Sequence, residues 1–315
     1  MNTKINVKCK YIEDYNVASH TTFKIGGNAE IAFFPATVEE LLEVISYLKA
    51  NKLKCTIIGA GSNLLVSSKG ICGGVIFTTG LSEYTINKDG NVSFSSGLKS
   101  AKVAKLVFEA GFTGLEFLIG IPGSLGGAVI MNSSAHGQAI KDFITGADVL
   151  DIETCEIAHL TKEELKLDYR GSFAVNGKHL VLKAYFKLNK EDKTKIQDLM
   201  TFHVEYRQKN HPPITEANAG STFRNPKEGV YTAKLLQELG ARGSWSEGDA
   251  IISDKHGNFV TNRGNASSLD IARLMFRMFN EVKNAYGYEL IAEVRNVGEF
   301  TQEEETIWKT ISAHK

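Results

Sequence analysis

A serine between a glycine and a short basic turn is the first feature of this 315-residue chain that could do chemistry. The run Ala219–Pro226 reads Ala-Gly-Ser-Thr-Phe-Arg-Asn-Pro, and no histidine or Gly-x-Ser-x-Gly elbow surrounds Ser221 as in a hydrolase. Two upstream stretches, Gly59–Val66 and Gly120–Asn132, are rich in glycine and suited to phosphate groups. Loops that could hold a phosphate-bearing cofactor, and a serine that could donate a proton but has no histidine beside it, together predict redox chemistry with a protonation step. They do not predict acyl transfer.

The first glycine-rich stretch begins Gly-Ala-Gly-Ser-Asn-Leu. A dinucleotide fingerprint needs a third glycine where Leu64 stands, and a helix where Leu64–Val66 reads as a strand. The loop instead offers backbone N–H groups, the Ser62 hydroxyl and the Asn63 amide. A tight strand-to-strand turn would explain these glycines equally well.

The second stretch, Gly120–Ala128, has four glycines in nine residues and lacks the lysine of a P-loop. Two loops with few side chains can hold a diphosphate cofactor between them, and Asn132 could add a side-chain contact. The histidines and cysteines show no metal-binding spacing, so no metal site is expected.

Two further segments carry charged side chains that could line a site. Tyr169–Ser172 places Arg170 before a glycine turn, where a guanidinium can pair with a carboxylate, although a solvated turn arginine is the alternative. In Leu290–Arg295, strand alternation puts Ile291, Glu293 and Arg295 on one face. That face either lines a site or meets solvent, and the sequence alone favours solvent.

The bulk composition limits the class of protein. The length predicts two or three domains, and the net charge of zero argues against a general nucleic-acid or membrane-surface protein. The four cysteines form no Cys-x-x-Cys pair, which favours free thiols in a reducing cytoplasm. No apolar run reaches the roughly 18 residues of a membrane span, and the N-terminus lacks a signal-peptide core.

Hydrophobic periodicity predicts the elements that must position these residues. One predicted helix begins after Thr37, which forms a capping pair with Glu40. A second covers Lys99–Ala110. A third begins after Ser267, which forms a capping pair with Asp270, and ends at Gly287. Predicted strands are Cys55–Ile58, Gly73–Phe77, Val92–Phe94 and His179–Leu188. Gly120–Gly137 is expected to be an ordered loop, and a domain boundary is expected near Asn189–Lys195.

Together these motifs resemble the UDP-N-acetylenolpyruvoylglucosamine reductases, the flavoenzymes of peptidoglycan precursor synthesis. The resemblance covers nearly the whole chain, from Thr21–Gly27 to Glu293–Gly298, with six motifs in the family's order. It implies an α+β fold in which a two-part FAD-binding region of the vanillyl-alcohol-oxidase type precedes an α/β substrate-binding domain. The implied parts are FAD-binding subdomains at 1–75 and 76–192, a substrate-binding domain at 193–300 and a tail at 301–315.

The resemblance also implies the reaction. NADPH reduces non-covalently bound FAD, and the reduced flavin delivers hydride to the vinyl carbon of UDP-N-acetylglucosamine enolpyruvate, which becomes UDP-N-acetylmuramate. Ser221 supplies the proton, while Arg170 and Glu293 stabilise charge at the substrate carboxylate. Glu293 would help only when protonated or donating a hydrogen bond. Arg224 and Asn225 match positions near the substrate diphosphate.

Other implied properties concern the cofactor and partners. The compact spacing between Arg170 and Ser221 resembles the shorter subclass, without a tyrosine-bearing loop over the substrate. The chain is expected to act as a monomer, without nucleic acid or membrane. The positions implied to contact the flavin are Gly59, Gly61, Ser62, Asn63, Leu64, Ile121, Pro122, Gly123, Ser124, Gly126, Gly127, Asn132 and Arg207.

The chain departs from the family pattern in two places. Ser134 and His136 replace a glycine and an aromatic residue of a flavin loop, and the segment with Trp245 and Glu247 is unlike the usual glycine-rich version. Two other functions stay open. One is a flavin oxidase of the same superfamily, with FAD tethered through His136. The other is a flavin- or nucleotide-sugar-binding module that has lost catalysis.

Overall fold

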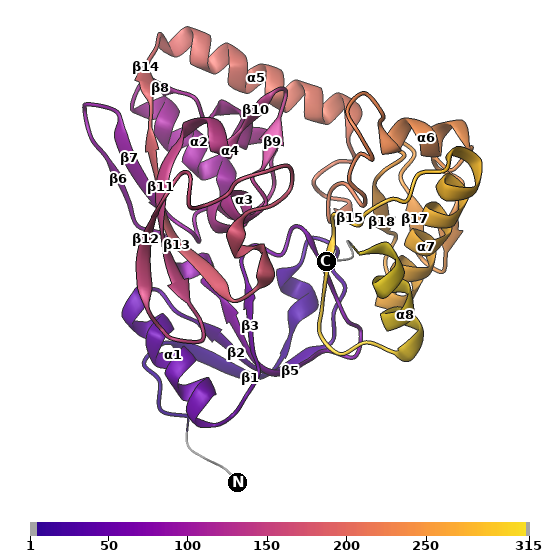
Figure 1. The fold of residues 1–315 in the computed structure, drawn as a ribbon, viewed down its shortest axis with the longest axis horizontal. Helices are drawn as coiled ribbons and strands as arrows, with labels where there is room; N and C mark the ends of the chain where they lie inside the picture. Colours follow the sequence, from indigo (N-terminus) through magenta and orange to yellow (C-terminus); the bar gives the residue numbers. More distant parts are fainter. Residues whose placement is uncertain (1–4, 313–315) are drawn as a thin grey trace. The chain divides into compact units, whose positions relative to one another are not determined.

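The computed structural model describes residues 5–312, with the backbone alone at 175 and 176. The chain forms two units, each built from segments far apart in sequence (Figure 1). The first unit takes the chain up to Glu13, then Ile31–Ala60 and Gly73–Arg207. The second takes Asp14–Glu30, Gly61–Cys72 and the chain from Gln208. The domain ends at 75, 192 and 300 stay a prediction, and residues 313–315 of the expected tail lie outside the described residues.

A four-stranded sheet covered by one helix belongs mostly to the first unit. Its strands run in the order β1 (Lys10–Asn16), β2 (Asn28–Phe34), β5 (Ile71–Phe77) and β3 (Cys55–Ile58). One end each of β1, β2 and β5 falls in the second unit. The helix α1 (Val38–Ala50) begins as predicted, because the Thr37 hydroxyl accepts the Glu40 N–H at 3.2 Å. The Glu40 carboxylate accepts the N–H of Ala36 rather than that of Thr37. The apolar face of α1 packs on Phe33 and Ile76 of the sheet.

The second sheet of this unit has five antiparallel strands. Its order is β12 (Ile157–Thr161), β11 (Ile144–Asp151), β13 (His179–Lys187), β7 (Asn91–Ser95) and β6 (Tyr84–Ile86). Two short pairs accompany it: β9 (Ser134–Ala135) with β10 (Gln138–Ala139), and β8 (Phe112–Thr113) with β14 (Asn189–Lys190). The helices are α2 (Ser100–Glu109), α3 (Leu125–Ile130), α4 (Ile140–Phe143) and α5 (Lys193–Asn210).

The expectation of a loop over Gly120–Gly137 was wrong in its middle. A 3-10 helix, Glu116–Gly120, leads into the segment, and the short helix α3 occupies Leu125–Ile130. Apolar side chains explain the helix in spite of two glycines, because Leu125 and Val129 are fully buried in the core of this unit. Tertiary packing therefore overrides the low helix propensity of glycine here.

The second unit joins short strands to three helices. Its strands are β15 (Ala217–Asn218), β18 (Val260–Asn262), β17 (Ala250–Ile252) and β16 (Ser246–Glu247) in one antiparallel sheet, and β4 (Leu64–Val66) parallel to β19 (Arg295–Val297). Its helices are α6 (Thr232–Glu238), α7 (Ser268–Tyr286) and α8 (Gln302–Ile311). Together with the first unit this confirms the predicted α+β class. No helix within residues 5–312 is long and apolar enough to cross a membrane.

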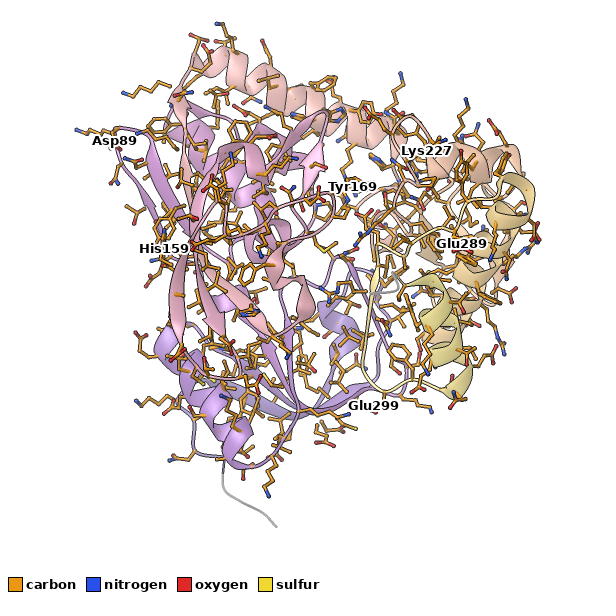
Figure 2. All side chains as sticks on the ribbon, viewed as in Figure 1. Asp89, His159, Tyr169, Lys227, Glu289 and Glu299 are labelled. Carbon is orange, nitrogen blue, oxygen red and sulfur yellow. The ribbon has the colours of Figure 1, made fainter. Side chains whose placement is uncertain are left out.

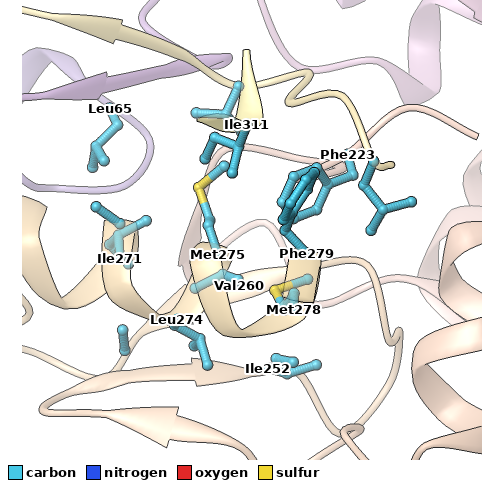
Figure 3. Close-up of a cluster of buried hydrophobic side chains, with 14 of the residues drawn as sticks. Leu65, Phe223, Ile252, Val260, Ile271, Leu274, Met275, Met278, Phe279 and Ile311 are labelled. Carbon is cyan, nitrogen blue, oxygen red and sulfur yellow. The ribbon is translucent and has the colours of Figure 1, made fainter. Parts of the chain in front are cut away.

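Helix α7 is the centre of the core of the second unit (Figure 3). Ser267 and Asp270 form the predicted capping box, and Gly287 ends the helix with φ +74°. The α7 residues Leu274, Met275 and Met278 are fully buried, as the predicted apolar stripe requires. Trp308 of α8 is buried in the same core. The part of the expected tail that the structure describes is thus a docked helix.

Replacing Leu274 with alanine should lower the free energy of unfolding by about 3 kcal/mol, because it removes buried apolar volume and leaves a cavity. Chemical denaturation followed by circular dichroism measures the change. A loss well under 1 kcal/mol would mean that the core closes around the cavity. Leu274 lies on α7, outside the candidate site segments described below, so the folded variant should keep the hydrogen bonds that position them.

Candidate active site

The two glycine-rich loops approach each other within the first unit. Gly59 directly follows β3, and a Cβ added to it would lie only 2.3 Å from the Ser124 hydroxyl oxygen. A side chain at position 59 would require the Ser124 hydroxyl to move, because this hydroxyl lies directly against the Gly59 backbone. Ile121, Pro122, Gly123, Gly126 and Gly127 lie in the loop and helix around Ser124. The predicted proximity of the two loops is confirmed for this pair of residues.

The backbone N–H groups of the second loop serve the protein itself. Leu125 donates to the carbonyl of Leu98, and Gly126 donates to the carbonyl of Ser96, each at 2.8 Å. Three buried hydroxyls beside these loops have no hydrogen-bond partner within residues 5–312: those of Ser96, Ser100 and Ser172. A buried polar atom is costly unless something pairs with it, so these hydroxyls fit a bound polar ligand. Sequence reasoning missed them, because isolated serines carry no spacing signal.

Arg170 lies at the tip of a two-residue turn that Tyr169 marks in Figure 2. Asp168 and Gly171 exchange backbone hydrogen bonds, and Arg170 takes φ +56°, an uncommon backbone conformation for a side-chain-bearing residue. Its guanidinium donates to the Ser134 hydroxyl at 2.9 Å. Arg170 is half-buried, so its side chain is only partly solvated at this turn.

Asn132 ties this turn to the glycine-rich segment. Its amide nitrogen donates to the Asp168 carbonyl at 3.0 Å, and its amide oxygen accepts the Lys141 N–H at 2.9 Å. The side chain expected to contact the cofactor therefore organises the loop. Arg207, near the end of α5, has a buried Nε without a hydrogen-bond partner in the described residues. Burial also lowers the pKa of the Arg207 guanidinium.

The Ser221 segment lies in the second unit beside the segment that carries Glu293. The Thr222 carbonyl accepts the Glu293 N–H at 2.9 Å, and the Arg224 N–H donates to the Ile291 carbonyl at 2.9 Å. Phe223 forms an isolated antiparallel bridge with Ala292. The structure thus brings together the backbones that carry two of the three predicted catalytic residues, whereas Arg170 belongs to the first unit.

The downstream half of the first glycine-rich loop positions Glu293. The Asn63 amide donates to the Glu293 carbonyl, and the Asn63 carbonyl accepts the Arg295 N–H, each at 3.0 Å. Gly61 is required here, because a Cβ on it would lie 2.3 Å from the His20 carbonyl oxygen. Ser62 and Leu64 complete this part of the loop.

The face expected to meet solvent around Glu293 is partly exposed, with Ile291 at 38%. Glu293 and Arg295 are both half-buried, and β19 begins only at Arg295. Burial lowers the pKa of Arg295, and the nearby positive charge of Arg224 lowers it further. No ion pair joins Arg295 to an acid in the part of the chain described. Two neighbouring guanidiniums in a partly buried place favour an anionic ligand.

Two further features complete the second unit. The Asn225 amide oxygen accepts the N–H of Thr232, the first residue of α6, at 3.1 Å. A separate cavity of about 530 Å³ is lined in part by β15, β17 and β18. Charged and polar side chains around it include Lys24, Glu216, Asp254 and Arg263.

Family models match both parts of the chain. One described as an FAD binding domain matches residues 29–161, and one described as the C-terminal domain of UDP-N-acetylenolpyruvoylglucosamine reductase matches residues 212–297. The reductase of Clostridium tetani is 40% identical over 89% of this chain and 90% of its own length. The reductase of Bacillus pumilus is 37% identical over 92% of this chain and 95% of its own.

A crystal structure of the reductase from Thermus caldophilus matches with a TM-score of 0.76 at 28% identity, covering 93% of this chain and 100% of that one. An FAD-binding domain joined to such a C-terminal domain defines an FAD-dependent oxidoreductase. The chain belongs to the UDP-N-acetylenolpyruvoylglucosamine reductase family. This confirms the resemblance that the motifs predict, while assignment to the shorter subclass stays a prediction.

Stability should fall in acid because of His256, beside the Ser221 segment. Burial, with a smaller contribution from Arg242, lowers the pKa of His256 from 6.5 to about 4. The unfolded chain then binds the proton first, so unfolding becomes easier by about 3 kcal/mol as the pH falls from 6.5 to 4. Urea denaturation across this range measures the slope. His256→Asn, which does not titrate, should flatten it; an equal slope in both proteins contradicts the assignment.

Proposed function

We propose that this chain reduces UDP-N-acetylglucosamine enolpyruvate to UDP-N-acetylmuramate with NADPH and FAD, the step of peptidoglycan precursor synthesis for which its relatives are named. The observation that carries the proposal is the hydrogen bond between the Thr222 carbonyl and the Glu293 N–H. It fixes a hydroxyl at Ser221 and a carboxyl at Glu293 on adjacent segments, in a chain of this family.

FAD, when bound, supplies the hydride that the vinyl carbon receives. On this proposal the loops around Gly59 and Ser124 hold it, because their glycines let a ligand approach the backbone closely. The buried hydroxyls of Ser96 and Ser100 and the Nε of Arg207 supply polar partners that the described residues do not satisfy. His136 is the residue through which a covalent tether to FAD was considered. Its ring centroid lies 4.3 Å from that of Tyr206 and 5.0 Å from that of Phe202. Because the ring packs against these aromatic side chains, we propose that FAD is held without a covalent bond.

The protein side of the chemistry is proton delivery and charge stabilisation. Ser221 gives its proton to the carbon next to the substrate carboxylate. Arg170 stabilises the charge that develops on that carboxylate, and Glu293 adds to this when it donates a hydrogen bond. Arg224 and Arg295 bind a further anionic group, which the substrate diphosphate supplies.

Ser221→Ala should separate the two half-reactions. Reduction of the bound flavin by NADPH needs no proton from Ser221, so its rate should stay within about twofold of wild type, whereas reoxidation by the UDP-sugar should slow by about 100-fold or more. Anaerobic stopped-flow absorbance at the flavin band measures both rates. Equal slowing of the two steps would contradict the proton-donor role, and absence of reoxidation in the wild-type protein would contradict the substrate.

Ser134→Ala should reduce the stabilisation of the substrate carboxylate by Arg170. It removes the hydroxyl that accepts a hydrogen bond from the Arg170 guanidinium at 2.9 Å. The expected effect is about a fivefold to tenfold fall in kcat/KM for the UDP-sugar, typical of one charge-assisted hydrogen bond. Steady-state kinetics measures it, with the KM for NADPH as the internal control. Unchanged kinetics in Ser134→Ala beside a large loss in Arg170→Met would show that Arg170 needs no support from Ser134.

We also propose that the chain acts as a monomer in the cytoplasm, without nucleic acid or membrane. The balance of 36 basic and 36 acidic residues supports this, because neither sign of charge dominates. Light scattering of the purified protein tests the oligomeric state.

A further inference from the structure

We propose that Asn258 is a positioning residue that holds the Ser221 segment in register with Glu293. This inference rests on the proposed function, because it assigns Asn258 a role through Ser221. Asn258 lies on the turn between β17 and β18, and its side chain is 3% exposed. It touches the backbone of the Ser221 segment and reaches the chemistry only through that backbone.

The Asn258 side chain pairs with both backbone groups of Phe223. Its amide oxygen accepts the Phe223 N–H at 3.0 Å, and its amide nitrogen donates to the Phe223 carbonyl at 2.8 Å. The Asn258 carbonyl also accepts the Thr222 N–H at 2.8 Å. One residue therefore makes three hydrogen bonds to two successive residues, the contacts that a neighbouring strand would otherwise provide.

The opposite edge of the same segment pairs with the Glu293 segment. The Thr222 carbonyl accepts the Glu293 N–H, and the Arg224 N–H reaches the Ile291 carbonyl. Thr222 is thus held from both sides, by Asn258 through its N–H and by Glu293 through its carbonyl. Because side chains alternate along an extended segment, a slip by one residue would turn Ser221 to the opposite face. Asn258 opposes that slip.

The turn that carries Asn258 is itself fixed. The Asn258 N–H donates to His256 Nδ1 at 3.3 Å, and the Phe259 N–H donates to the His256 carbonyl at 3.0 Å. A Cβ added to Gly257 would lie 2.6 Å from the Ala233 carbonyl oxygen, so the turn lies directly on α6. A rigid support lets the amide define where the Ser221 segment lies rather than follow it.

The alternative is a role in stability alone, because a buried amide that pairs with buried backbone groups is costly to remove. The two roles differ in what they change. A loss of stability lowers the fraction of protein that reacts, whereas a displaced Ser221 lowers the rate constant of the molecules that do react. Displacement should also affect only the step that takes the proton from Ser221.

The experiment uses single-turnover stopped-flow absorbance on the FAD-loaded full chain, with Asn258→Ala and Asn258→Asp. Asn258→Ala should slow reoxidation by the UDP-sugar by about 10- to 100-fold, because a small misplacement of a reacting group has such a cost. Reduction by NADPH should stay within about twofold of wild type, since it needs no proton from Ser221. Asn258→Asp keeps an acceptor for the Phe223 N–H but loses the donor, so its reoxidation rate should also fall while NADPH reduction is retained.

Leu274→Ala is the control for stability, because it removes buried volume from the core of the same unit and removes none of the hydrogen bonds that Asn258 makes. It should lower the amplitude of reoxidation at most and leave the rate constant unchanged. The positioning role is overturned when the Asn258 variants lose only amplitude, or when both half-reactions slow equally. If Asn258→Ala does not fold, the rate constant of Asn258→Asp decides the same question.

Ser221→Ala, measured alongside, separates this inference from the proposed function. When Ser221→Ala slows reoxidation and the Asn258 variants do not, the positioning role fails and the proposed function stands. When Ser221→Ala reoxidises at the wild-type rate, the proton-donor role fails, whatever the Asn258 variants do.

Discussion

Every segment that carries a candidate catalytic side chain lies outside the regular sheets, so its buried backbone groups need partners that a neighbouring strand does not supply. Asparagine amides meet much of this need. Asn63 binds the carbonyl of Glu293, Asn132 binds the carbonyl of Asp168 before the Arg170 turn, and Asn258 binds both groups of Phe223. An amide both donates and accepts, as a peptide group does, and can stand in for one. The positions of the candidate side chains depend on these pairings.

The pairing of backbone groups with asparagine amides does not use the arginine side chains nearby. Backbone and amide pairing organises the loops without acidic side chains, and the structure shows no acid paired with Arg295 among the described residues. Burial lowers the pKa of Arg207 and of Arg295, so each guanidinium loses solvation that the protein does not fully replace. An anionic ligand beside either guanidinium would restore that stabilisation, so each of the two positions favours negative charge.

Elements with a strong local signal were predictable from the sequence. The caps at Thr37 and Ser267 and the stop at Gly287 fixed α1 and α7, because caps and periodicity act over a few residues. The two loops that approach each other at Gly59 and Ser124 could be singled out from the sequence by their glycines. The roles of individual polar residues were not predictable from the sequence. Asn63, Asn132 and Asn225 were expected to contact ligands, yet each side chain forms a hydrogen bond with a backbone group. For Asn63 and Asn132 that backbone group is distant in sequence. Helix α3 likewise depends on long-range packing that glycine content obscures.

Ser134 shows how a departure from the family pattern can keep a site intact. A glycine at this position has no side chain to offer, whereas Ser134 places a hydroxyl 2.9 Å from the Arg170 guanidinium. Arg170 holds a left-handed backbone at the tip of a two-residue turn, a conformation that surrounding contacts must stabilise. The hydroxyl is a neutral acceptor, so it orients the guanidinium without cancelling its charge, as a carboxylate would. The substitution therefore adds an anchor for Arg170 that carries no charge of its own.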